Sequence, residues 1–198
     1  MRYLDRAFAL AVATFLLGSL AGAFLVLTVP LIRGPLVWLL QTRMVAPIGT
    51  VSRFGDAALI LLVFVNNSIP AALSFVYPLM IAKIHWTPPL NTRKKRALLT
   101  SFTWLCAFLV GLFGFGVALA ISWVVGGDSL LFNLLTGARV HGPLELFSVL
   151  FCVSEPMRLA EHCDGIELMT GLRRDLGLFS FCLLILLLSA TIEVLTSV

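Results

Sequence analysis

Four apolar runs in this chain are each long enough to cross a lipid bilayer as a helix. A bilayer core about 30 Å thick needs about 20 consecutive apolar residues in a helix. A fifth run, 143–160, is shorter and carries Glu145, Glu155 and Arg158, so we expect a more polar span there. The four strong runs are 7–29, 57–82, 97–125 and 176–196. The sequence therefore predicts an all-α, polytopic helical membrane protein with about five transmembrane helices in a single domain, residues 1–198.

The composition supports this fold class and argues against a water-soluble domain. Hydrophobic residues make up 60% of the 198 residues, and charged residues only 12%, whereas a soluble domain carries about 25% charged residues. The expected surroundings are the lipid bilayer of the cell membrane. The four cysteines show no spacing typical of a disulfide framework or a zinc site. They are Cys106, Cys152, Cys163 and Cys182.

Basic residues predict how the chain is oriented. Cytoplasmic loops of membrane proteins carry an excess of Lys and Arg. The strongest basic break between apolar runs is 83–96, which we therefore place in the cytoplasm together with the N-terminus, leaving the C-terminus outside. This reading puts nine of the 14 basic residues inside and takes the charge as a topology signal, with no nucleic-acid partner. The nine are Arg2, Arg6, Lys83, Arg93, Lys94, Lys95, Arg96, Arg173 and Arg174.

The segment 31–55 lies between the first two runs and carries arginines at ten-residue spacing, Arg33, Arg43 and Arg53. Ten residues is close to a whole number of helical turns. The pattern favours an amphipathic segment in the membrane interface, with its basic face toward lipid headgroups. Pro35 and Pro47 interrupt it, which predicts more than one short helix. An ordinary connecting loop is the alternative.

Small residues at four-residue spacing mark faces where helices can pack closely. In lipid, such residues let two backbones approach, which favours helix association within a chain or in a homodimer or higher homo-oligomer. The pairs are Gly18 with Gly22 in the first run, and Gly114 with Ala118 and Gly116 with Ala120 in the third.

Two groups of polar residues fall inside the runs, where polar side chains are costly and often functional. Asn66 and Asn67 are adjacent, so on a helix they point about 100° apart and can bond two different neighbours. Interhelical bonding and a solute or ion site are both open for them. Glu193 lies in the last run, with Arg139 and His141 as candidate partners.

The stretch "RVHGPLELF" begins the fifth run. Pro143 suits a first helical turn because it has no N–H to satisfy, which predicts Gly142 as the N-cap. Glu145 can then turn back to the free N–H groups of the helix start. The alternative is that His141 and Glu145 form a proton-handling or ion-binding pair.

The sequence carries no H-E-x-x-H, G-x-S-x-G or P-loop pattern, so we expect no enzyme, no metal and no cofactor. The order of its polar motifs resembles the stage II sporulation protein M family. The matching pieces are "FVNN", a glycine-rich third run, Asn133, "HGPLEL" and "ATIE". The resemblance implies an all-helical membrane protein that works as a scaffold, which in sporulating cells holds cell-wall hydrolases during engulfment.

Two functions follow as hypotheses. The first is a non-enzymatic membrane scaffold that organises other membrane or envelope proteins. The second is a transporter or channel whose polar path runs through Asn66, Asn67, His141, Glu145 and Glu193.

Overall fold

The computed structural model describes residues 2–42, 46–83, 91–139, 141–161 and 166–196. Every element in these ranges is helical, which confirms the predicted all-α fold class. The helices are α1 (Arg2–Thr28), η1 (Pro30–Ile32), α2 (Arg33–Leu40), α3 (Ala46–Val51), η3 (Ser52–Phe54), α4 (Asp56–Lys83), α5 (Thr92–Leu109), η4 (Val110–Val117), α6 (Ala118–Gly137), α7 (His141–Val153), α8 (Glu155–Glu161) and α9 (Ile166–Thr196).

Four of the described helical stretches are long and apolar enough to cross a membrane, and each contains or overlaps one of the four strong runs. They are Arg6–Thr28, Asp56–Ile81, Thr92–Asn133 and Arg173–Thr196. The fifth run instead forms two shorter helices, α7 and α8, which do not belong to this set. Its polar residues therefore lie on the one broken helix among the five predicted spans.

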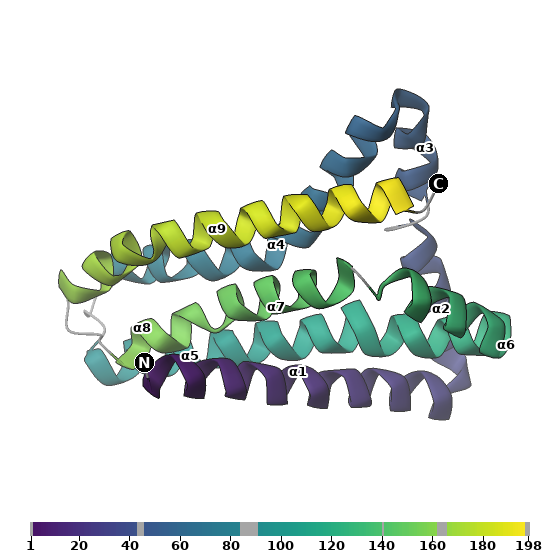
Figure 1. Cartoon of the computed structure of the whole chain (residues 1–198). Coiled ribbons are helices and arrows are strands. Elements are labelled where there is room, and N and C mark those ends of the chain that lie inside the picture. The colour runs from purple at the N-terminus through teal and green to yellow at the C-terminus, as the bar shows by residue number, and fades with distance from the viewer. Residues whose placement is uncertain (1, 43–45, 84–90, 140, 162–165, 197–198) are drawn as a thin grey trace.

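The helices are arranged in two outer pairs with α7 and α8 between them (Figure 1). In one pair α4 lies along α9, and in the other α1 lies along α5 and η4. The segment from Ser148 to Ala160 is buried apart from partial exposure at Phe151 and Met157. The second half of the most polar predicted span is thus buried inside the bundle.

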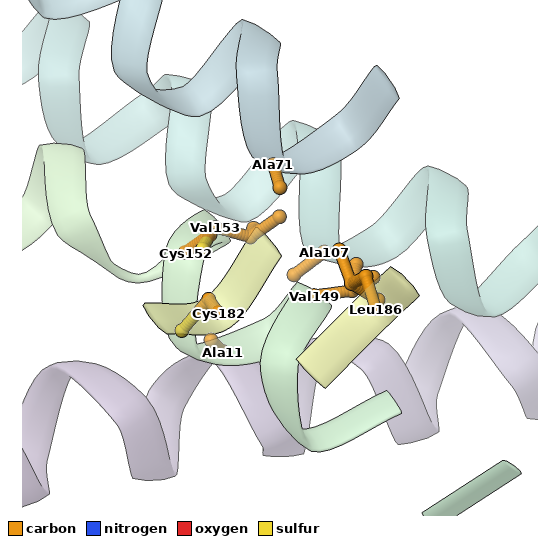
Figure 2. Close-up of a cluster of buried hydrophobic side chains, with 8 residues drawn as sticks. All are labelled: Ala11, Ala71, Ala107, Val149, Cys152, Val153, Cys182 and Leu186. Atoms are coloured by element: carbon orange, nitrogen blue, oxygen red, sulfur yellow. The ribbon is translucent and has the colours of Figure 1, made fainter. Parts of the chain in front are cut away.

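Small side chains form the centre of the core. Figure 2 shows eight buried residues contributed by five helices, α1, α4, α5, α7 and α9. They are Ala11, Ala71, Ala107, Val149, Cys152, Val153, Cys182 and Leu186. Because lipid tails are as apolar as these side chains, packing and hydrogen bonds hold such helices together in a membrane. Small residues favour both by allowing close approach.

The third long stretch changes helix type and then direction. Its middle part, η4, is a π-helix, in which each hydrogen bond closes over five residues. At Gly127 the backbone has φ 64°, a conformation that glycine adopts without steric cost. The chain turns there, and Trp123 Nε1 donates to Asp128 Oδ1 across the turn at 2.9 Å. After this turn the chain folds back toward the start of α7 (Figure 1).

The segment 31–55 is broken into short helices, as Pro35 and Pro47 suggest. Arg33 bonds within the chain: its Nε donates to the carbonyl of Val26 at 2.8 Å and its Nη2 to that of Leu27 at 2.9 Å. It caps the end of α1, where four carbonyls lack helical partners. Arg53 is exposed, and Arg43 lies outside the described residues.

Candidate functional site

The start of α7 and the end of α9 bring three ionisable residues together, which we name the His141 cluster: His141, Glu145 and Glu193. His141 Nε2 lies 3.9 Å from Glu193 Oε2. Glu145 interacts electrostatically with Glu193. Residues three or four apart share one face of a helix, so His141 and Glu145 both meet α9. The structure thus places these three predicted site residues at one point.

Ser189 fixes the register of the two helices at this point. Its hydroxyl donates to the carbonyl oxygen of His141 at 3.1 Å, and the Ser189 side chain is fully buried. It lies four residues before Glu193, so both face α7. A hydroxyl four residues before an intramembrane carboxylate was the available signal for this contact, and our reading of the sequence missed it.

Gly142 is not the N-cap of α7. The helix begins at His141, and the Gly142 N–H donates to the carbonyl of Ala138 at 2.8 Å. The preceding turn thereby continues into α7. Pro143 still occupies the first turn, where no backbone donor is required. A Cβ at Gly142 would lie 3.4 Å from Ala138 Cβ, an ordinary contact.

Asn66 and Asn67 do not join the His141 cluster. Asn66 is exposed, and its Nδ2 donates to Asn67 Oδ1 at 3.3 Å. Both lie on α4, which continues as a helix through Pro70. The two asparagines therefore bond each other on α4, while His141, Glu145 and Glu193 gather between α7 and α9. Arg139, the other candidate partner of Glu193, is exposed.

The second polar centre lies where the central helix breaks between α7 and α8; we name Ser154, Glu155 and Arg158 the break cluster. Pro156 has no N–H to donate back to the helix, which interrupts the ladder at this point. Arg158 Nη2 turns back to the carbonyl of Phe151 at 2.9 Å and to Ser154 Oγ at 3.1 Å.

Arg158 also forms an ion pair inside the protein. Its Nη1 lies 3.0 Å from Glu155 Oε2, and both side chains are about nine-tenths buried. The guanidinium lies 4.3 Å from the ring centroid of Phe151. Three-residue spacing favours the Glu155–Arg158 contact. The pair therefore places a positive charge at the end of α7 and a negative charge at the start of α8, as the helix dipole favours.

Helix α5 supplies further polar contacts to the broken helix. Thr103 Oγ1 accepts from the Met157 N–H at 3.1 Å, and Arg96 Nε donates to the carbonyl of Ala160 at 3.0 Å. The first contact satisfies a free N–H at the start of α8, and the second a free carbonyl at its end. No sequence pattern predicted either contact, because both partners lie more than 50 residues apart.

Glycines let α1 pack closely against the end of α5 and against η4. A Cβ at Gly18 would collide with the carbonyl of Phe108, and one at Gly22 with that of Leu112. On the other helix, a Cβ at Gly111 would meet the carbonyl of Phe15, and one at Gly116 that of Ser19. The backbones of the two helices therefore touch at glycines from both sides.

Gly114 does not form this contact. Gly114 is exposed, and a Cβ there would approach only its own helix, at 4.0 Å from Val110 Cγ1. The reason is the π-helix: five-residue closure returns Gly111 and Gly116 to one face. The four-residue spacing therefore identified one glycine that lies at the contact, Gly116, and one that lies away from it, Gly114.

The chain matches none of the protein-family models, curated proteins or solved structures with which it was compared. The resemblance to the stage II sporulation protein M family stays a prediction.

Proposed function

We propose that this chain is a non-enzymatic integral membrane scaffold that organises partner proteins in the membrane. The observation that carries the proposal is the use of polar side chains along the broken central helix. Arg158, Arg96 and Thr103 are engaged with helix ends of the same chain. These groups hold a broken central helix in place, which suits a rigid platform for other proteins.

A scaffold also needs surface for its neighbours. Large apolar side chains cover the outer faces of α1 and α9, where Leu20, Phe24 and Leu184 are all more than half exposed. In a bilayer these faces are available to lipid and to the transmembrane helices of partner proteins.

We place the molecule with its basic end in the cytoplasm. Helix α1 begins, α4 ends and α5 begins at one end of the bundle, where α9 also begins (Figure 1). The nine basic residues that the sequence assigns to the inside belong to these helix ends or to the first turns of α9. Their common location agrees with the excess of positive charge on the cytoplasmic side.

The test is affinity capture from native membranes in mild detergent, with quantification of co-purifying proteins. The wild type is compared with His141→Ala/Glu145→Gln, and Arg139→Gln serves as an exposed control at the same end of the bundle. We expect defined partners with the wild type and the control, and their loss with the double variant. Size-exclusion chromatography confirms that each variant remains folded. A monodisperse, partnerless monomer from native membranes would contradict the proposal.

Proton or ion transport is the second candidate, and the His141 cluster favours it. Two carboxyl groups and an imidazole lie together at a helix end, a combination found in intramembrane proton relays. The test is proton flux into liposomes containing the purified chain. Proton flux with the wild type that disappears in Glu145→Gln would support transport. Wild-type flux equal to that of empty liposomes would argue against the transport function.

A further inference from the structure

A small cavity lies between α4, α7, α8 and α9, separate from the His141 cluster. Its volume is about 10 Å³, close to the space that one water molecule needs. The rings of Phe75, Phe151 and Phe179 form much of its wall, and Glu155 and Asp175 contribute its carboxyl groups. The cavity is therefore mostly apolar, with two acidic side chains at one place.

One oxygen atom of the Glu155 carboxyl group lacks a hydrogen-bond partner within the described part of the chain, which suggests that this cavity binds a ligand. The Glu155 side chain is only 8% exposed, and its Oε2 is engaged with Arg158. Its Oε1 is buried and has no hydrogen-bond partner among the described residues. Buried polar atoms are almost always hydrogen-bonded, because leaving one without a partner is costly. A group that binds Oε1 would remove this cost.

The charges around the cavity do not balance. Asp175 interacts with Glu155, so two carboxyl groups meet here. The positive group beside them is Arg158, which also donates hydrogen bonds to the Phe151 carbonyl and to Ser154 Oγ. Asp175 belongs to neither of the two ion pairs found among the described residues. Two negative charges and one positive charge leave a net charge of one negative. The thiols of Cys152 and Cys182 are the other titratable groups that interact with these residues.

We propose that this cavity binds one small monovalent cation between Glu155 and Asp175. A single positive charge neutralises the excess, and the volume admits nothing larger than one water molecule. A proton shared by two close carboxyl groups and a bound Na⁺ both provide this charge. The apolar wall offers few oxygen ligands, so we expect the proton. This site is independent of the proposed scaffold function.

The proton is tested by infrared spectroscopy of the purified full chain during a pH titration. The readout is the C=O stretching band of a protonated carboxylic acid. We expect one such band in the wild type that is missing in Asp175→Asn, while Asp56→Asn, an exposed control on α4, retains it. Asp175→Asn leaves the Glu155–Arg158 pair intact and so is expected to fold. Glu155→Gln is a second variant that should also lose the band. If Glu155→Gln does not fold, the comparison of the wild type with Asp175→Asn decides the test.

Sodium is tested by the melting temperature of the same proteins in NaCl and in choline chloride at equal ionic strength. A ligand that binds only the folded state raises the melting temperature with its concentration. A rise with Na⁺ in the wild type that is lost in Asp175→Asn would identify Na⁺ as the occupant. Identical infrared bands and identical salt responses in the wild type and Asp175→Asn would overturn the proposal.

Discussion

Arg158 reaches back seven residues to the carbonyl oxygen of Phe151, to which its Nη2 donates at 2.9 Å. The same guanidinium forms an ion pair with Glu155 at 3.0 Å. One side chain thus closes the last turn of α7 and holds the first residue of α8. The helix break that Pro156 imposes is thereby stabilised inside the bundle.

Replacing Arg158 should strongly destabilise the protein. Arg158→Met leaves the buried carboxylate of Glu155 without its cation, and breaking such a pair costs about 3–5 kcal/mol. The double variant Arg158→Met/Glu155→Met removes both charges and should regain part of the loss. Thermal unfolding in detergent measures the effect. An Arg158→Met protein as stable as the wild type would show that the pair does not hold the break.

Two glycines of η4 should respond in opposite ways to alanine. Gly116→Ala drives a Cβ into the backbone of Ser19, so α1 must move away and stability should fall. Gly114→Ala meets nothing on another helix and should be neutral or stabilising by up to about 1 kcal/mol, because alanine favours helices over glycine. Unfolding temperatures of the two variants provide the comparison. Equal losses would place the α1 contact on a different face of η4.

Ser189 should contribute measurably to the contact between α7 and α9. Ser189→Ala removes the hydrogen bond to the His141 carbonyl, and interhelical hydrogen bonds in membranes are worth about 0.6 kcal/mol on average. Thr191→Ala is the control, because the Thr191 hydroxyl bonds within its own helix to Leu187. We expect the larger loss in Ser189→Ala. The reverse order would argue against the helix register described above.

Cys152 and Cys182 should be linked by a short thiol-reactive crosslinker that enters the membrane. Both are free, buried cysteines on the neighbouring helices α7 and α9, and both belong to the core cluster in Figure 2. Mass spectrometry of peptides should identify the linked pair. Cys106→Ser should retain the link and Cys182→Ser should lose it. Absence of the link under denaturant-free conditions, with Cys106 modified instead, would contradict this packing.

Hydropathy was sufficient for the long helices but not for the central one. Continuous apolar length identifies α1, α4 and α9, because a helix in lipid must satisfy its own backbone. The break at Ser154 depends on Arg158 and on Thr103, which lies on another helix. Such tertiary contacts are absent from a linear pattern. Pro156 was visible in the sequence, yet its effect depends on what replaces the lost hydrogen bond.

The polar residues of the predicted spans also show that a linear pattern does not contain tertiary contacts. His141 was named as a candidate partner of Glu193, and the two side chains do lie together. Spacing did not reveal that Asn66 would lie elsewhere, because two helices with polar residues need not turn them toward each other. The arginine repeat likewise did not reveal that Arg33 bonds carbonyl oxygens at the end of α1.

The assembly state of the chain in native lipid is the decisive test of the proposed scaffold function. Polymer-extracted nanodiscs, prepared without detergent, can be captured through a tag and analysed by native mass spectrometry. We expect a defined complex in which the chain is present at fixed stoichiometry with itself or with other proteins. A chain that is monomeric in native nanodiscs, with proton flux in liposomes that requires Glu145, would contradict the scaffold and establish transport instead.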